Sequence, residues 1–397
     1  MNPRTAALGF DPGQAAGHAA FALAAAPLSA HTVMFPLWRV VVRAAVTEAQ
    51  PYQLIDRYLV RGVGEAGLTG SADLASFLSL DPALVRQALA FLRAVGHVEG
   101  EDGSLALTAL GRRSLEDRKL YTVELDDRRI LRFDGFSSEP LSGAYYHRTG
   151  AGLTGEGQQR GAAIPLLFPE RFREAAVAEL AGLSDRERYN LPLAIKIRDI
   201  VGYEVEYLPA CVVHVARGPE GARHLVCTRP LRGEHDPRLG AALETSDSAL
   251  SALMAANEDA RSNFDEESGR WLSGKGLSGF RPRRVNGGSP RVGLAADAFR
   301  TAGEKGLPPM GSLVVLPSGG LFQLWCEDVQ ARRRELVRRV EARLDTARSP
   351  AAVRTRLGLL VARLEPGPLD DDALCGLAVA EGSRALGDRL RRILSGT

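Results

Sequence analysis

Three consecutive helices are predicted between residues 52 and 95, where apolar side chains recur every three to four positions. Ser71 fits the N-cap of the second helix and Asp81 that of the third, with Pro82 in its first turn. Gly96 fits the position that follows the third helix. The apolar stripes consist of Leu54, Ile55, Tyr58, Leu59, Val63, Leu74, Phe77, Leu78, Leu84, Val85, Ala88, Leu89, Leu92 and Val95.

Strands are predicted where apolar residues alternate or β-branched residues cluster. A two-stranded hairpin is expected over residues 98–107, with its turn at Glu101-Asp102-Gly103, and a helix restarts at Leu107. The end of the chain, Glu327 to Thr397, is expected to be helical. The other segments expected to be extended are 33–46, 119–147 with a turn at Asp126-Asp127, the hairpin 203–229, and the hairpin 311–325 around residues 317–320.

The pattern as a whole predicts an α+β fold with a linker between two compact parts. Five glycines crowd into residues 150–161 without an apolar period, which is typical of a linker; an active-site lid is the alternative. The expected division is a poorly ordered leader at 1–32, a first domain at 33–118, a β-rich extension at 119–148, the linker at 149–163, and a mixed α+β domain of unknown role at 164–397 that ends in helices.

The order of elements from residue 52 to residue 117 carries the one resemblance to a known family. Helix, helix-turn-helix, two-stranded hairpin and the following Leu107-Thr108-Ala109-Leu110-Gly111-Arg112 helix resemble a winged helix-turn-helix domain. The resemblance covers about 65 residues, and no family is recognised for the rest of the chain. It implies that Pro82–Ala94 is the recognition helix, which enters the major groove of DNA, and that Glu99–Ser104 is the wing tip.

Few side chains on the expected recognition helix suit DNA. Arg86 is able to contact guanine or a phosphate, Gln87 is able to pair with adenine, and Arg93 is the third polar group. Winged helices also serve as protein-interaction modules, and Arg86 and Arg93 also fit a solvated helix face, so these alternatives stay open. The wing tip carries three carboxylates that phosphate repels, Glu99, Glu101 and Asp102.

Composition is that of a soluble globular protein, with 45% hydrophobic residues, 25% charged residues and a formal net charge of +2. No run approaches the roughly 18 uncharged apolar residues of a membrane span. The four cysteines have no metal-site or disulfide-scaffold spacing, which indicates a reducing cytoplasm. Residues 19–30 faintly resemble a signal peptide, but polar residues and glycine precede them. We expect a cytoplasmic protein with no membrane partner.

Charge is unevenly distributed along the second half of the chain. Residues 244–268 hold seven acids and one base, whereas residues 271–350 hold fourteen bases and seven acids. Arginine provides 46 of the 50 basic residues, a bias typical of a GC-rich bacterial genome, which weakens arginine clusters as signs of phosphate binding. A Gly- and Pro-rich stretch contains the bases Lys275, Arg281, Arg283, Arg284 and Arg291. It is a candidate accessory phosphate-binding loop, and the alternative is that its arginines pair with the acidic segment 244–268.

The chain matches two nucleotide-binding motifs only in part and lacks the common hydrolase motif. Gly62–Gly67 satisfies GxGxxG, but no buried strand precedes it and Thr69-Gly70 interrupts the helix that should follow. Gly269–Lys275 matches a P-loop, except that Gly276 replaces the residue that ligates magnesium. No GxSxG nucleophile elbow occurs. We therefore expect no cofactor and assign no catalytic residue.

Strand geometry argues against a zinc site in the hairpin 203–229. Cys211 and Cys227, like His214 and His224, are symmetric about Pro219, so each pair is expected to be a cross-strand pair. Residues three apart on one strand point to opposite faces, and four ligands on two faces cannot surround one tetrahedral zinc. We expect a cysteine pair on one face, a histidine pair on the other, and no metal.

The expected function is that of a bacterial DNA-associated protein, not an enzyme. It would be a winged-helix transcription regulator or a DNA-binding accessory subunit of a DNA-handling or antiviral defence complex, with duplex DNA as its partner. The DNA-binding residues are Arg86, Gln87, Arg93, Arg281, Arg283 and Arg284.

Two alternatives belong to other classes of protein. An enzyme with an active site dispersed over residues 164–397 should gather several polar side chains in one pocket. The candidates for such a pocket are Asp199, Glu204, Glu206, His214 and His235. A protein–protein scaffold or a homodimer, with the winged helix as its interaction module, should expose an apolar patch instead.

Overall fold

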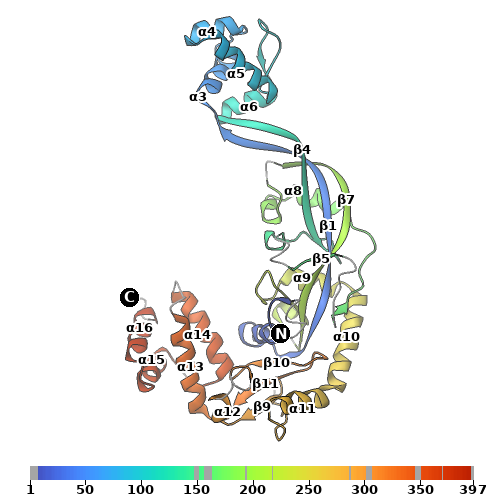
Figure 1. Ribbon diagram of the computed structural model, residues 1–397, viewed down its shortest axis with the longest axis vertical. Coiled ribbons are helices and arrows are strands. Elements are labelled where there is room, and N and C mark those ends of the chain that lie inside the picture. Colours follow the sequence, from blue (N-terminus) through green and yellow to red (C-terminus); the bar gives the residue numbers. More distant parts are fainter. Residues whose placement is uncertain are drawn as a thin grey trace.

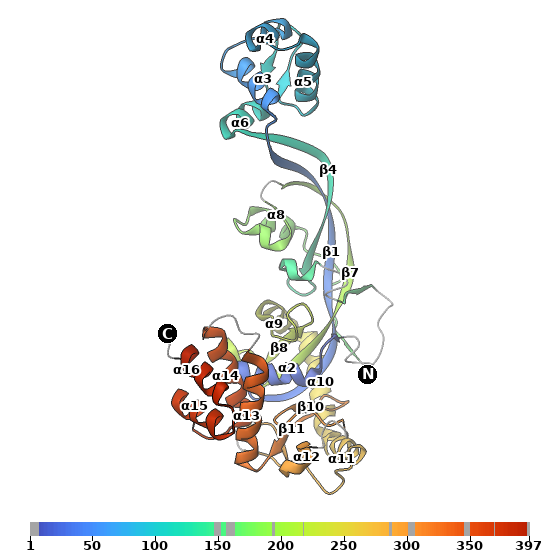
Figure 2. The same cartoon turned by 60° about the vertical axis from the view of Figure 1, so that its left-hand side comes forward.

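The computed structural model describes residues 8–146, 152–155, 163–192, 195–216, 218–285, 288–300, 306–344, 350–368 and 370–394. These residues form an elongated α+β molecule (Figure 1). A small head, residues 52–118, lies at one end on a two-stranded arm, and a larger mixed body lies at the other end, which Figure 2 shows from a second side.

Three long strands form the spine of the molecule. β1 (Pro27–Pro51) lies in the middle, antiparallel to β4 (Lys119–Asp134) on one side and to β7 (Ile195–Val215) on the other. The predicted strand 33–46 is the middle of β1. Its alternate residues face two separate cores, one containing Phe35 and the other Trp38. The sheet is completed by β5 (Thr154–Gly155), β6 (Ile164–Pro165) and β8 (His224–Thr228).

The turn expected at Asp126-Asp127 is absent, because β4 continues as a strand through both residues. Pairing with β1 keeps this segment extended, with Ala44 opposite Asp127 and Val46 opposite Glu124. The register shifts by one residue between these two pairs, which is a β-bulge. Two local acidic residues therefore mark a bulge where the sequence predicted a turn. Beyond it, β1 and β4 alone continue as the arm, pairing residues 47–51 with residues 119–123.

The described part of the expected leader, residues 8–32, is ordered, so the expectation of poor order is wrong there. Helix α2 (Pro12–Gly17) is capped by Asp11, whose carboxylate accepts the Gly13 N–H at 2.6 Å, and a π-helical turn, η1 (His18–Ala22), follows it. Ala15 and Ala16 are fully buried against the sheet. Alanine-rich sequence shows no clear apolar period, yet its small side chains allow close packing. The domain boundary expected at residue 33 also falls inside β1.

The predicted linker, 149–163, lies mostly outside the described residues. Thr154 and Gly155 within it form β5, which pairs with Tyr207 and Glu206 of β7. This part of the expected linker is therefore an edge strand of the main sheet.

The head has its own apolar core and the predicted helices. Asp81 caps its third helix by accepting the Ala83 N–H at 2.6 Å, and Gly96 follows that helix with φ +77°. The elements in chain order are α3 (Leu54–Gly64), α4 (Ser71–Leu78), α5 (Pro82–Ala94), β2 (Val98–Glu99), β3 (Ala106–Leu107) and α6 (Ala109–Asp117).

The body packs helices against the far end of the spine and against a second, three-stranded sheet. The predicted hairpin 311–325 is its antiparallel pair, β10 (Leu313–Val315) and β11 (Leu321–Cys326), and β9 (Arg291–Leu294) pairs parallel to β11. The last described elements, up to residue 394, are helices, as predicted. Helix α8 (Ala175–Gly182) packs against the spine between the head and the body (Figure 1). The helices of the body are α9 (Pro237–Glu244), α10 (Asp247–Ser262), α11 (Phe264–Gly274), α12 (Ala296–Arg300), α13 (Val329–Leu344), α14 (Pro350–Leu364), α15 (Asp371–Ala380) and α16 (Arg384–Leu394).

Candidate functional site

Helix α5 of the head presents one full face to solvent, because its buried residues, Val85, Ala88, Leu89 and Leu92, lie on the opposite side. Helical spacing divides the exposed residues into three parallel rows. The rows are an apolar flank of Leu84 and Phe91, a crest of Ala83, Gln87, Ala90 and Ala94, and a basic flank of Arg86 and Arg93. We call these three rows the α5 face.

Large apolar side chains are exposed on and beside the α5 face. Leu84 is 46% exposed, Phe91 is 44% exposed, and Phe77 on the neighbouring helix α4 is 65% exposed. Burying one such side chain completely is worth about 1.5–3 kcal/mol. The helical period predicts Phe77 and Leu84 in the apolar stripes that form the core, but the structure places both at the surface. The α5 face therefore combines an exposed apolar row with an exposed basic row.

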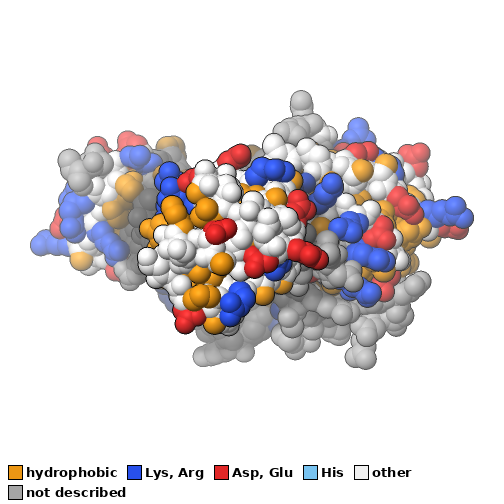
Figure 3. Space-filling model, turned by 90° about the horizontal axis from the view of Figure 1, so that it is seen from above, with side chains coloured by type: hydrophobic (Ala, Val, Ile, Leu, Met, Phe, Trp, Pro, Cys, Tyr) orange, Lys and Arg blue, Asp and Glu red, His pale blue; other side chains and the backbone are white. Residues whose placement is uncertain are grey.

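The head lacks the positive charge that a DNA-binding surface normally carries. Residues 52–118 contain nine acids and seven bases, a net charge of −2. Figure 3, which looks onto the head end, shows separate acidic, basic and apolar side chains and no continuous basic field. Long-range attraction of a polyanion to the head is therefore weak.

Asp102 at the tip of the β2–β3 hairpin has a structural role that the sequence analysis missed. Its carboxylate accepts the Ser71 backbone N–H at 2.5 Å and the Ser71 hydroxyl at 2.8 Å, and these bonds lower its pKa. Ser71 is the first residue of α4, and the N-cap is Gly70, so the prediction that Ser71 is the cap is wrong. Because glycine has no side chain to cap the helix, Asp102 does so from the hairpin. Because Ser71 offers itself as a local cap, the sequence carries no signal of this contact.

The six predicted DNA-binding residues occupy two distant places. Arg86, Gln87 and Arg93 lie together on α5 and are exposed. The other three, Arg281, Arg283 and Arg284, are exposed in the loop after α11. Figure 1 shows α5 and α11 at opposite ends of the molecule, so the two groups do not form one compact surface.

The carboxylates proposed for a dispersed active site are paired within the sheet instead. Asp199 lies 3.3 Å from Arg43, Glu204 lies 2.7 Å from Arg39, and Glu206 lies 2.8 Å from the buried Arg132. In each case a cross-strand arginine balances the charge. The pairs lie along the spine, and of these three the Arg132–Glu206 pair is buried whereas the other two are partly exposed.

The cysteine and histidine pairs of the β7–β8 hairpin follow the predicted register. Cys211 is opposite Cys227, and His214 is opposite His224, with their rings stacked at 5.2 Å between centroids. Both cysteines lie in one apolar core with Val213 and Leu225, and the alternation of side chains along the strands places the two histidines on the opposite face. Among the described residues, no group of three or more His, Cys, Asp or Glu side chains is placed to hold a metal.

We expect this histidine pair to destabilise the body at acid pH. Burial, with the neighbouring His224, lowers the pKa of His214 to about 4, and burial also lowers the pKa of His224, against the opposing effect of Glu244. Between the ordinary histidine pKa of 6.5 and pH 4, His214 is protonated in the unfolded chain but neutral in the native protein. The free energy of unfolding therefore falls as the pH falls.

Denaturant unfolding at several pH values measures this effect. The variant His214→Phe keeps a ring against His224, and its stability should fall less steeply between pH 6.5 and 4.5 than that of the unaltered chain. Arg223, Arg261 and His31 also face His214 and lower its pKa, and they remain in both proteins. Parallel pH profiles for the two proteins would contradict the assignment.

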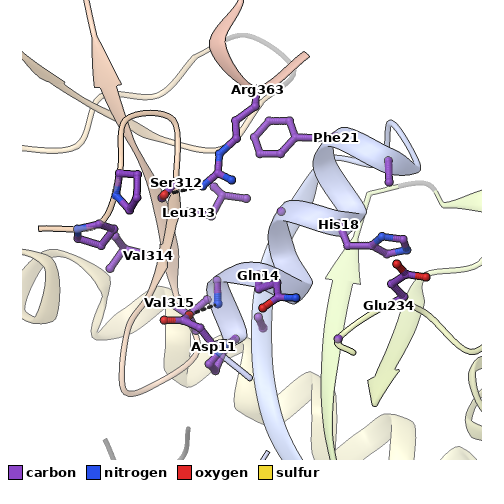
Figure 4. Close-up of a pocket in the computed structure, with 18 of the residues that line it drawn as sticks. Asp11, Gln14, His18, Phe21, Glu234, Ser312, Leu313, Val314, Val315 and Arg363 are labelled. Carbon is purple, nitrogen blue, oxygen red and sulfur yellow. Dashed lines mark hydrogen bonds between the residues drawn. The ribbon is translucent and has the colours of Figure 1, made fainter. Parts of the chain in front are cut away.

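A cleft of about 980 Å³ lies between the N-terminal helix and the body. Figure 4 shows η1, β10 and Arg363 of α14 around it, with His18 pointing toward Glu234. At its rim the Gln14 side-chain amide donates to the Arg232 carbonyl at 2.9 Å, and Arg363 donates to the Ser312 hydroxyl. Burial lowers the pKa of His18 although Glu234 opposes the effect. None of the dispersed active-site candidates lines this cleft.

No described helix is long and apolar enough to span a bilayer. A scan of protein-family models and searches of curated proteins and of solved structures find no match to this chain.

Proposed function

We propose that this protein is an assembly scaffold whose head, a winged helix-turn-helix domain, docks a partner protein through the α5 face. The supporting observation is the exposure of Leu84 and Phe91 beside Arg86 and Arg93 on one helix. The occupant we propose is an amphipathic helix that carries apolar side chains in one row and acidic side chains in the next.

The order of elements in the head supports the winged-helix interpretation. Helices α3, α4 and α5 are followed by the antiparallel pair β2–β3 and then by α6, in the order that the family requires. In such a domain α5 occupies the position of the recognition helix. Its exposure at the free end of the arm, as Figure 2 shows, makes it accessible to a partner.

The chemistry of the α5 face favours a protein partner over DNA. A partner's apolar row would bury Leu84 and Phe91, and exposed patches of this kind mark protein interfaces. The crest is alanine apart from Gln87, and small side chains allow a second helix to approach closely. Acidic side chains on the partner would complement Arg86 and Arg93, whereas a net charge of −2 on the head disfavours phosphate.

We expect the double variant Leu84→Ser/Phe91→Ser to lose partner binding by at least tenfold, because it removes the apolar row. The measurement is binding to helical peptides selected by display from a library that varies apolar and acidic rows. Selected sequences should combine both rows, and Arg86→Ala/Arg93→Ala should weaken their binding mainly at low salt.

The head supplies a matched control. Leu54 and Tyr58 are another apolar pair, four residues apart on α3, and are 71% and 46% exposed. Leu54→Ser/Tyr58→Ser should leave peptide binding unchanged. Equal losses in both double variants, or selected peptides without acidic residues, would overturn the proposed face and its occupant.

Duplex DNA is the second candidate partner, and Gln87 on the small crest is the observation that favours it. Gln87 is exposed between Arg86 and the apolar flank, and glutamine pairs well with adenine in the major groove. Under this alternative the protein is a DNA-associated regulator or accessory subunit. An electrophoretic shift of duplex DNA at two salt concentrations then shows binding that Arg86→Ala/Arg93→Ala weakens by about 1–3 kcal/mol.

A further inference from the structure

We infer that the loop between α11 and β9 binds single-stranded nucleic acid, with Arg281, Arg283 and Arg284 on its phosphates and Phe280 stacked on a base. This site lies at the end of the molecule opposite the head (Figure 1), so the inference stands independently of the head's function. We call residues 276–285 the arginine loop.

Along the sequence around the arginine loop, every charged residue is basic. Residues 268–296 contain six basic residues and no acidic residue. Arg270 and Arg291 pair with Glu266 and Glu365, and the other four bases form no ion pair among the described residues, so they create a local positive potential. Such a potential attracts a polyanion, although the whole chain is close to neutral.

The loop backbone is held in place, so the arginines project from a fixed base. The Phe280 N–H donates to the Leu277 carbonyl at 3.0 Å, and Leu277 is buried. Arg283 and Arg291 exchange two backbone hydrogen bonds, of 2.7 and 2.8 Å, which tie the loop to the start of β9. A backbone ordered in advance loses less entropy when a ligand binds.

The three arginines are not neutralised within the described part of the chain. None of them forms an ion pair there, and all three are exposed. Two neighbouring basic residues, by contrast, interact within the protein. Arg291 pairs with Glu365 and lies over the Trp325 ring, and Lys275 donates to the Gly306 carbonyl.

The acidic segment 244–268 does not supply partners for the loop. Glu266 pairs with Arg270, Glu267 accepts from Ser318, and Glu244 accepts from backbone N–H groups of residues 223 and 224. The alternative that the arginines neutralise this segment therefore lacks support in the described contacts. Free arginines on an ordered loop instead favour an external anion.

Phe280 favours a single-stranded nucleic acid over other polyanions. It is 40% exposed and directly precedes Arg281. Single strands bind where basic side chains follow the backbone and an aromatic ring stacks on an unpaired base. The bases of a duplex are already stacked on one another, so a duplex would leave the Phe280 ring unused.

Fluorescence anisotropy of the full chain with labelled oligo(dT) of 20 nucleotides tests the inference, with a duplex of equal length as the comparison. We expect Arg281→Ala/Arg283→Ala/Arg284→Ala to weaken oligo(dT) binding at least tenfold at 50 mM salt. The slope of log affinity against log salt should decrease by about 2, since each lost single-strand contact removes about 0.7. Phe280→Ala should weaken binding about tenfold without changing that slope.

A second triple variant distinguishes the effect of the arginine loop from the effect of losing three positive charges anywhere on the protein. Arg57→Ala/Arg112→Ala/Arg118→Ala removes three exposed arginines from the head, outside the α5 face, and should leave oligo(dT) binding unchanged. Replacing the three loop arginines with lysine should retain most of the salt slope, and circular dichroism should show each variant folded. Equal losses in the two alanine triples, tighter binding of the duplex, or an unaffected Phe280→Ala variant would each overturn the proposed site.

Discussion

The variant Glu206→Gln is expected to unfold with a free energy about 3–4 kcal/mol lower than the unaltered chain. Glu206 and Arg132 form an ion pair at 2.8 Å with side chains only 4% and 5% exposed. Removing one charge leaves the Arg132 guanidinium buried without its counter-ion, and such losses cost several kcal/mol. Denaturant unfolding followed by circular dichroism measures the change.

The control for this pair lies two residues away on the same strand. Glu204 pairs with Arg39 at 2.7 Å, but its side chain is 62% exposed, so Glu204→Gln should cost below about 1 kcal/mol. The double variant Arg132→Met/Glu206→Leu should recover most of the stability that Glu206→Gln loses, because it buries no charge. A loss below about 1 kcal/mol for Glu206→Gln would contradict the importance of this pair to the spine.

The variant Gly13→Ala is expected to lower the free energy of unfolding by about 2–3 kcal/mol and to loosen the N-terminal helix. A Cβ atom at this position would lie 2.2 Å from the Leu313 carbonyl oxygen on β10 and 2.9 Å from the Asp11 carboxylate. The first of these atoms is backbone and cannot rotate away. Either α2 or β10 must therefore shift, which would open the contact that borders the cleft.

Gly17 on the same helix provides the comparison. A Cβ atom there would meet only the Phe21 ring, at 3.8 Å, so Gly17→Ala should keep or raise stability, by up to about 1 kcal/mol. Limited proteolysis near residue 12 should cut Gly13→Ala faster than either the unaltered chain or Gly17→Ala. Equal proteolysis rates for all three would show that α2 tolerates the added methyl group.

Local signals in the sequence were sufficient to predict the helices of the head and the hairpin of the body. Asp81, Pro82 and Gly96 set the ends of α5 through interactions within a few residues, and the structure has those ends. The symmetry about Pro219 predicted the register of β7 and β8, because an antiparallel hairpin pairs residues with a constant index sum. The mixed α+β class follows from the same local patterns.

Contacts between distant segments decided what the sequence analysis predicted wrongly or missed. Residues 8–26 are ordered because the sheet covers them, and β4 passes through Asp126-Asp127 because β1 pairs with it. Asp102 caps α4 from 31 residues away. None of these contacts leaves a local period in the chain.

The exposed residues of the candidate surfaces were likewise fixed by tertiary packing. Leu84 and Phe77 belong to apolar helical stripes in the sequence, yet the head's core closes over Val85 and Leu89 and leaves them outside. Arginines 281, 283 and 284 are alike in sequence to the many that form ion pairs, and only the fold decides which arginines meet a carboxylate. A sequence specifies side-chain chemistry and local conformation, whereas burial and charge pairing depend on which distant segments the fold brings into contact.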